Sequence, residues 1–497
     1  MLRREWPYLI AALALLPLMI TGDSLWMDEG TTSGYAMQPD FQGWLSFLHH
    51  DQGGDCQMPL GMFFAWLGGK TLGVGEWQMR AVNIFWGALT LVFMARIGRR
   101  LQLPWLPLFF VLQPFFWFYT NEARPYAPQI TFGAMVLLSL VQFLQDRGRG
   151  LGWTVTFTMG SVLLCFASML APALVAATAG VGGMIAIRNG WKIGRRSLLI
   201  ILPGAVLLLP LGYYYFETLV RGAKGTQFWN VDLKYLVYIG YEISGCLGLG
   251  PSVENLRELA LRGMWLSPGE FIVQWGLPFS LLAVVSVVFI LAVWNRRRDD
   301  DEYLLPIFLP FLLEVTVLFL AGLLIHKAFW PRHYSPAFPF YATALALALR
   351  SSLVSRQRFA QAVSLVLLGL LIAAVIGIRF GPEHRKEDYR WASDRAMGFL
   401  RQGKDVWWCA GGTTASYYGV TFDARKPGGQ GEIFLINQGT WDGKFPITVS
   451  GVESSVPDEI FLSRPDVHDR NGAVRKLIRD YGYHVEETRR SFELWVR

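Results

Sequence analysis

Long apolar runs limit what this chain can fold into more than any other feature of its sequence. Each run is roughly 20 residues long, the length that an α-helix needs to cross the hydrocarbon core of a bilayer. The runs lie near residues 6–22, 79–95, 103–120, 126–144, 151–168, 170–187, 197–216, 271–294, 303–325, 334–349 and 359–378. The sequence therefore predicts a polytopic α-helical membrane protein with about 11 spans.

Basic residues indicate how these spans are oriented. They gather in every second connection, at Arg3 and Arg4, Arg96 to Arg100, Arg147 and Arg149, Arg188 to Arg196, Arg296 to Arg298, and Arg350 to Arg358. The positive-inside rule places these connections in the cytoplasm, so in the plasma (inner) membrane we expect the N-terminus inside and the C-terminus outside. The first run lacks a convincing small-residue cleavage site and is interpreted as a retained helix. The net charge of +7 forms no basic stripe with interleaved aromatics, which disfavours a nucleic-acid partner.

The first outer loop, residues 23–78, is too long for a simple connection. Within it Phe41, Trp44, Leu45 and Leu48 recur at helical spacing. This pattern predicts a short amphipathic helix that lies flat in the outer membrane interface. A second outer loop, at about 217–270, is expected to cover the same face.

The composition changes after about residue 380, where charges become frequent and apolar runs shrink to strand length. Residues 1–379 are therefore predicted to form the membrane domain, and residues 380–497 a soluble α/β domain on the outer side. Its expected strands are 406–409, 432–436, 459–462 and 492–496, and residues 469–481 have helical periodicity with an Asp near the start.

Four cysteines fit no metal-binding spacing and no CxxC pair. Cys56, Cys246 and Cys409 all fall outside in this topology, so one disulfide among them is one interpretation. Isolated buried thiols are the other interpretation, and the one that we favour.

The first candidate site is the acidic stretch at the start of the first outer loop, which holds Asp23, Asp28 and Glu29. A carboxylate there can serve as the general base that takes a proton from an acceptor hydroxyl. Adjacent side chains point in different directions, so we expect one of the pair Asp28 and Glu29 to face the site, and favour Asp28. The alternative is that these acids only end a helix at the interface.

The second candidate site lies between the third and fourth runs. Glu122, Arg124 and Tyr126 are predicted to contact substrate there, and Arg124 offers a planar fork for a carboxylate or a phosphate. Pro125 keeps the residue before it out of helical conformation. The alternative is an ordinary interface turn with an internal ion pair.

The third candidate site is a cationic cluster at the outer end of the ninth run, formed by Lys327, Arg332, His333 and Tyr334. The positive-inside rule does not require cations on this side, so an anion such as a lipid-linked phosphate is the expected partner. Lys224 in the second outer loop is a further candidate for that phosphate. The alternative is an anchor whose side chains reach the lipid headgroups.

Other ionisable residues give weaker signals. Asp51 and Asp55 are candidates for substrate binding, and His49, His50 and Asp51 are weak candidates for a divalent cation. Their spacing matches no metal template, so a cation is possible but not required. Glu314 lies inside a run, where an ionisable group is either functional or satisfied by a neighbouring helix.

Three motifs together resemble the GT-C class of integral-membrane glycosyltransferases. This class includes protein O-mannosyltransferases, bacterial aminoarabinose transferases that act on lipid A, and lipopolysaccharide-core sugar transferases. The motifs are Trp26-Met27-Asp28-Glu29 with the later Met58-Pro59-Leu60 and the 76–80 segment, Asn121 to Tyr126, and Pro331 to Tyr334 followed by Phe338-Pro339. They span residues 1–350 in the order of that class. Many relatives have a His-Pro-Pro-like element where this chain has Gln57-Met58-Pro59, which leaves the acceptor and any metal contact open.

The resemblance implies an inverting glycosyltransferase of cell-envelope glycan synthesis. Its donor would be a polyprenyl-phosphate-linked sugar, and its acceptor a hydroxyl of a glycolipid, glycan or protein on the outer face of the membrane. No nucleotide, covalent intermediate or cofactor is required. The competing interpretation is a transporter or flippase of lipid-linked sugars, which would spread charge through the midplane and show paired repeats. An O-antigen polymerase or ligase would place its large outer loop late in the chain.

Overall fold

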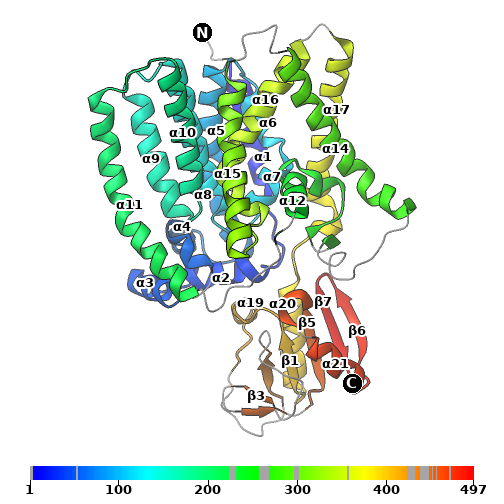
Figure 1. Cartoon of the computed structure of the whole chain (residues 1–497). Helices are drawn as coiled ribbons and strands as arrows, with labels where there is room; N and C mark the ends of the chain where they lie inside the picture. Colours follow the sequence, from blue (N-terminus) through cyan, green and yellow to red (C-terminus); the bar gives the residue numbers. More distant parts are fainter. Residues whose placement is uncertain are drawn as a thin grey trace.

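The chain folds into a bundle of membrane-length helices and a smaller α/β domain at one end of it (Figure 1). This computed structural model describes residues 4–51, 54–222, 231, 233–253, 255–256, 268–295, 302–354, 357–422, 431–436, 447–449, 452–454, 456–469 and 472–497. The end of the bundle that meets the α/β domain is called the domain-side end below.

Seven described helices are long and apolar enough to cross a membrane, and this confirms the predicted multi-pass helical class. They are α5 (Glu76–Arg100), α8 (Tyr126–Gln145), α11 (Arg195–Gly222), α14 (Pro268–Asn295), α15 (Leu304–Ile325), α16 (Phe338–Val354) with the preceding 3₁₀ helix η3 (Pro331–Ala337), and α17 (Arg358–Phe380). Three shorter apolar helices stand with them: α1 (Trp6–Met19), α9 (Gly152–Ala167) and α10 (Pro172–Arg188).

The expected span at 103–120 is divided into two short helices, α6 (Leu106–Val111) and α7 (Pro114–Thr120). Gln113 between them is extended, with φ −82° and ψ 122°. The residue before a proline is pushed out of the helical region, so Pro114 ends one helix and begins the next. The total of 11 spans stays a prediction.

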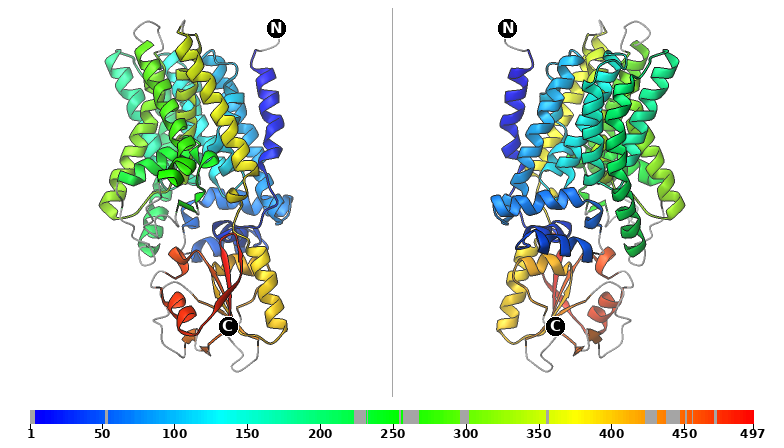
Figure 2. Two further views of the ribbon diagram at one scale, coloured as in Figure 1. Left: turned by 90° about the vertical axis from the view of Figure 1, so that its right-hand side faces the viewer. Right: turned by 90° about the vertical axis from the view of Figure 1, so that its left-hand side faces the viewer.

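Several short helices lie across the domain-side end of the bundle, between it and the α/β domain (Figure 2). They are α2 (Met27–Ala36), α3 (Phe41–His50), the 3₁₀ turn η1 (Asp55–Gln57) and α4 (Pro59–Thr71). Helix α3 is the predicted amphipathic helix, capped by Asp40, whose side chain accepts from the Gly43 N–H at 2.7 Å. Trp44 and Leu48 face inward, whereas Phe41 and Leu45 are half exposed. Helix α12 (Leu233–Ile243) and η2 (Cys246–Leu249) come from the second outer loop.

The α/β domain is built on a five-stranded sheet with the order β2-β1-β5-β7-β6. The strands are β1 (Val406–Cys409), β2 (Ile433–Leu435), β5 (Glu459–Ser463), β6 (His484–Arg489) and β7 (Phe492–Val496), and β3 (Ile447–Val449) pairs with β4 (Val452–Ser454) in a separate hairpin. Strand β1 is parallel to β2 and β5, and β7 is antiparallel to β5 and β6. The helices are η4 (Pro382–His384), α18 (Tyr389–Arg401), α19 (Gly412–Tyr417), α20 (Pro465–His468) and α21 (Ala473–Asp480).

Both faces of this sheet are covered. Trp408 packs on the face with Tyr389 and Phe399 of α18, and Trp407 on the face with Leu477 of α21. Every residue of β1 is therefore buried, as expected for a central strand between helices.

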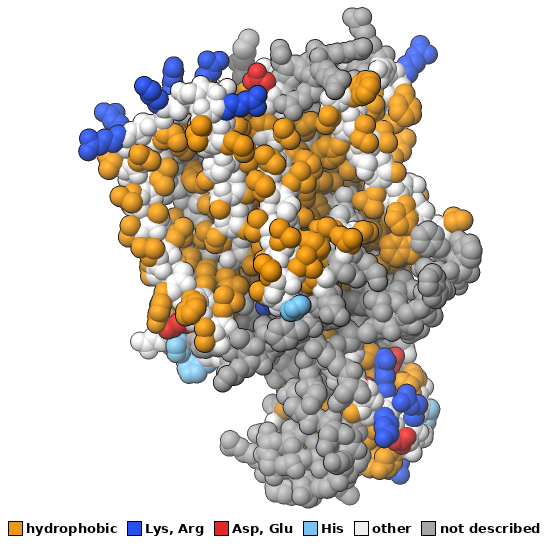
Figure 3. All heavy atoms as spheres, in the orientation of Figure 1, with side chains coloured by type: hydrophobic (Ala, Val, Ile, Leu, Met, Phe, Trp, Pro, Cys, Tyr) orange, Lys and Arg blue, Asp and Glu red, His pale blue; other side chains and the backbone are white. Residues whose placement is uncertain are grey.

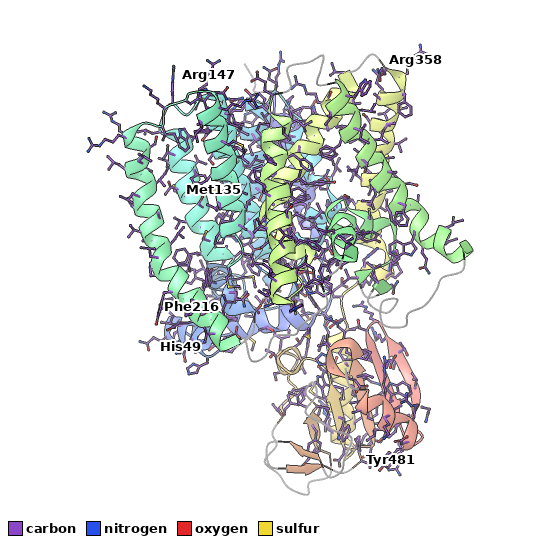
Figure 4. The ribbon with its side chains drawn as sticks, in the orientation of Figure 1. His49, Met135, Arg147, Phe216, Arg358 and Tyr481 are labelled. Atoms are coloured by element: carbon purple, nitrogen blue, oxygen red, sulfur yellow. The ribbon has the colours of Figure 1, made fainter. Side chains whose placement is uncertain are left out.

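The two ends of the bundle differ in their charged side chains. Lys and Arg gather at the end far from the α/β domain, while the sides between the ends are covered by apolar side chains (Figure 3). Arg147 and Arg358 lie at that far end, and His49 and Phe216 lie toward the domain-side end (Figure 4). This is the charge asymmetry on which the positive-inside prediction depends.

A close approach between α8 and η3 depends on one glycine. A Cβ at Gly133 would lie 1.9 Å from the carbonyl oxygen of Pro336, so Gly133→Ala must move the backbone that follows Arg332. We expect a loss of about 1–3 kcal/mol of stability from this overpacking. The unfolding temperature in detergent, followed with a thiol-reactive dye, measures it, because all four cysteines are buried. Gly180→Ala on α10, where nothing lies within 4 Å, is the matched control and should leave the temperature unchanged.

Candidate functional site

Glu29 fixes the start of α2 from inside the protein. Its carboxylate accepts from the backbone N–H of Trp26, the N-cap residue of α2, at 3.2 Å. It also accepts from Arg80 of α5, at 2.9 Å from Nε and 2.6 Å from Nη2, and from the Ala123 N–H at 2.7 Å. Arg80 in turn donates to the carbonyls of Thr21, Asp23 and Ser24.

This ion pair is fully buried, with both side chains 0% exposed. Burial alone would raise the pKa of Glu29, but the charge and hydrogen bonds of Arg80 bring that pKa below its ordinary value. Glu29 is therefore held as a carboxylate that touches Arg80 and backbone amides. The prediction that Glu29 takes part in catalysis has no support from this geometry.

The Asp28 side chain does not join Glu29 at Arg80 and instead forms an ion pair with Arg332. Arg332 Nη1 donates to Asp28 Oδ2 at 2.6 Å, joining residues 304 positions apart in the chain. Both side chains are partly exposed, at 24% for Arg332 and 18% for Asp28. The first and third predicted motifs are thus brought together, with Asp28 as the member of the acidic pair that binds Arg332.

Arg332 is positioned by η3, which packs against α8. The Ser335 hydroxyl donates to Gln129 Oε1 at 2.7 Å, and Tyr334 is buried beside it. His333 packs edge-on against Phe329, with ring centroids 6.0 Å apart. Lys327 lies just before η3, where burial lowers the pKa of its amine.

Arg124 forms an ion pair with Asp55, which the sequence did not predict. Its Nη1 lies 2.6 Å from Asp55 Oδ1 and also donates to the backbone carbonyl of Asp28 at 3.0 Å. Burial raises the pKa of Asp55 to about 6 despite this ion pair. Tyr126 is buried under the Arg124 guanidinium, and Asp51 accepts from the Tyr35 hydroxyl at 2.5 Å. Arg124 therefore helps to hold the backbone of Asp28 in place.

Arg332 also lines a cavity, which is called the central cavity here. Its walls are formed by Trp26, Phe118, Tyr119, Glu122, Tyr238, Glu242, Ser252, Val253, Trp330, Pro331, Arg332 and residues 383–387. It holds about 710 Å³ of space, part of it open to solvent.

Two buried carboxyls face this cavity. Glu122 accepts from Lys386 Nζ at 2.8 Å, and burial still raises the pKa of Glu122. Glu242 of α12 accepts from the Tyr119 hydroxyl, and burial raises the pKa of Glu242 to about 7. Lys386 also lies over the rings of Trp26 and Phe118. The sequence prediction included Glu122 but missed Glu242 and Lys386, because neither lies in a motif and each reaches the cavity only through the tertiary fold.

The remaining candidate residues are not brought together into one site. His49 and His50 are exposed on α3, with His50 bonded to the Ser46 carbonyl at 2.7 Å. Within the described part of the chain, no three His, Cys, Asp or Glu side chains are grouped as a metal site would require. Lys224 lies outside the described residues. All four cysteines are free thiols, so the disulfide interpretation is wrong and the buried-thiol interpretation is confirmed.

Comparison with known proteins gives a fold and no sequence family. No family model matches the chain, and no curated protein matches it by sequence. Among solved structures, ArnT from Cupriavidus metallidurans in the apo state matches with a TM-score of 0.54 at 12% identity, over 98% of this chain and 97% of that one. The same protein bound to undecaprenyl phosphate matches with a TM-score of 0.51 at 14% identity, with the same coverage. The chain thus shares the fold of ArnT over nearly its whole length.

The two neighbouring acids are expected to respond differently to loss of charge. Glu29→Gln leaves Arg80 buried without its counter-ion, so we expect a loss of about 3–5 kcal/mol of stability. Asp28→Asn removes a partly exposed ion pair and should cost about 1 kcal/mol or less. Denaturation in mixed detergent micelles measures both, and equal losses would contradict the assignment of Glu29 to structure and Asp28 to the site.

Proposed function

We propose that the protein is an inverting glycosyltransferase that moves a sugar from a polyprenyl-phosphate donor to a hydroxyl acceptor on the outer face of the plasma membrane. The observation that carries this proposal is the contact of Asp28 with Arg332 at the wall of the central cavity. A carboxylate and a guanidinium are the two groups that such a transfer needs, one for the acceptor proton and one for the leaving phosphate.

Arg332 can contact both the proposed base and the leaving phosphate. Hydrogen bonding to Asp28 occupies Nη1 of Arg332, and its other N–H groups have no hydrogen-bond partner among the described residues, so they are available for a phosphate. A planar guanidinium can therefore hold the base and the leaving group in a fixed relation. The negative charge that develops on the phosphate as the glycosidic bond breaks would be stabilised at this point.

Asp28 is the proposed general base. It would accept the proton of the acceptor hydroxyl as that oxygen attacks the anomeric carbon on the face opposite the phosphate, which inverts the configuration. Arg124 and the Thr32 hydroxyl donate to its backbone carbonyl and Arg332 to its carboxylate, so the base is fixed before substrate arrives. Glu122 and Glu242 are proposed to bind sugar hydroxyls in the cavity.

The proposed orientation of the protein in the membrane follows from the positions of its Lys and Arg side chains. Lys and Arg mark one end of the bundle, and the central cavity and the α/β domain lie at the other (Figure 3). With the basic end in the cytoplasm, the site and the α/β domain face outward. The ArnT structure bound to undecaprenyl phosphate supports a polyprenyl-phosphate donor for this fold.

Transfer from a polyprenyl-phosphate sugar by the purified protein tests the proposal. The acceptor is an extract of outer-face glycolipids, glycans and proteins. Asp28→Asn should lower kcat about 10² or more, because the attacking hydroxyl loses its base. Asp146→Asn, at the far end of the bundle, is the control and should keep full activity. If wild type transfers no sugar but carries the donor across a liposome membrane, the flippase interpretation replaces this one.

Arg332→Lys separates charge from geometry. Lysine keeps the positive charge but cannot bridge Asp28 and a phosphate with one planar group. We expect kcat/KM for the donor to fall at least about tenfold, as for the loss of one charge-assisted hydrogen bond. Steady-state kinetics with varied donor measures this, and unchanged kinetics would show that Arg332 acts only as a point charge or not at all.

A further inference from the structure

The stretch of chain that leads into Asp28 lies between the membrane bundle and the α/β domain. It comprises residues 22–27 and is called the entry segment here. From the bundle, Arg80 of α5 donates to the carbonyls of Asp23 and Ser24 within it. From the other side, groups of the α/β domain bind the same segment. The position of Asp28 therefore depends on both parts of the chain.

Tyr418, the residue that follows α19, makes the central contact from the domain. Its hydroxyl oxygen accepts from the Leu25 N–H at 2.7 Å, and its O–H donates to Glu76 Oε1 at 3.1 Å. Burial raises the pKa of Tyr418 to about 12, so the hydroxyl keeps this proton at neutral pH. Leu25 is 0% exposed, so its amide has no access to water and depends on this acceptor. Loss of the hydroxyl would leave a buried N–H unpaired.

Glu76 joins this contact to the helix that holds Glu29. It is the first residue of α5, and Arg80, which pairs with Glu29, lies about one turn further along the helix. Glu76 also pairs with Arg390 of α18, whose Nη2 lies 2.6 Å from Oε1. Arg390 in turn donates to the Gly22 carbonyl at 2.9 Å. Side chains of the α/β domain thus tie the entry segment to the first turn of α5.

A close packing contact continues this interface along α2. Helix α19 lies against α2 (Figure 1), and a Cβ at Gly30 would lie only 1.9 Å from Thr414 Oγ1. The Thr414 hydroxyl also donates to the Met27 carbonyl at 3.2 Å. These contacts precede and follow Asp28 in the chain. Helix α2 therefore cannot shift or turn against α19 without breaking them.

We propose that Tyr418 is a positioning residue for the transfer reaction, which fixes the entry segment so that Asp28 stays in contact with Arg332. The inference rests on the proposed function and gives the α/β domain a role in it. Tyr418 does not line the central cavity, so it acts through Asp28 and not by contact with the substrate. Such a role matters because displacement of a catalytic group by about 1 Å can cost about 10² in rate.

Hydrogen exchange tests the contact without turnover. In the full-length protein in detergent, Tyr418→Phe should speed exchange of the Leu25 amide about tenfold, because this N–H loses its acceptor. Tyr417→Phe is the matched control, since the neighbouring hydroxyl donates to the Val74 carbonyl at 2.7 Å, outside the entry segment. It should leave that exchange unchanged. No change with Tyr418→Phe, or equal changes with both variants, would overturn the proposal.

Transfer kinetics test whether the contact acts through the base. Tyr418→Phe should lower kcat about tenfold and leave KM for the donor unchanged, whereas Tyr417→Phe should keep both. In the Asp28→Asn background, Tyr418→Phe should have no further effect, because the group that it positions is already absent. A general loss of folded protein would instead lower the rate equally in both backgrounds, and that result contradicts a positioning role.

The outcomes separate this inference from the proposed function. If wild type transfers no sugar, or if Asp28→Asn keeps full activity, the proposed assignment of the base fails and the positioning role fails with it. If Asp28→Asn loses activity but Tyr418→Phe does not, the assignment of Asp28 stands and only the role of Tyr418 is overturned.

Discussion

The buried ion pair of Glu29 with Arg80 is the interaction on which the site depends. It joins the start of α2, the helix α5 and the Ala123 amide, while Arg80 also holds the carbonyls of residues 21–24. A buried ion pair adds little net stability compared with apolar residues, but breaking it leaves an uncompensated charge. Its effect is therefore to exclude other arrangements of the first outer loop. With Glu29 turned inward, Asp28 must turn outward toward Arg332.

The sequence predicted the architecture well because that part depends on local patterns. Apolar runs, the amphipathic spacing of 41–48 and the strand-length runs after residue 380 each report burial directly. The break at Pro114 was readable from the proline but was missed within a long apolar run. The sequence favours Asp28 over Glu29 but does not reveal their different partners, since Arg80 and Arg332 come close to them only in the folded chain. Glu242 and Lys386 were missed for the same reason, as only tertiary contacts bring them to the cavity.

The α/β domain is part of the site and not an appendage. Residues 383–387, which connect α17 to α18, form one wall of the central cavity, and Lys386 pairs with Glu122 there. Tyr418 of the domain accepts from the Leu25 N–H at 2.7 Å, two residues before α2, and Thr414 donates to the Met27 carbonyl at 3.2 Å. The segment that carries Asp28 is thus held from both sides. Motion of the domain would move the base and the cavity wall together.

The buried carboxyl groups of the cavity would couple binding of the proposed donor to the uptake of protons. Burial already raises the pKa of Glu242 to about 7, so this carboxyl takes up a proton near neutral pH, and burial also raises the pKa of Glu122. An anionic phosphate arriving at Arg332 would raise these pKa values further, because like charges disfavour ionisation. By linkage, a ligand that raises a pKa binds more tightly as the pH falls through it. The proposed base, Asp28, must by contrast be ionised, so donor binding and proton abstraction favour opposite directions of pH. Separation of the two tasks between Glu242 and Asp28 allows one site to meet both demands.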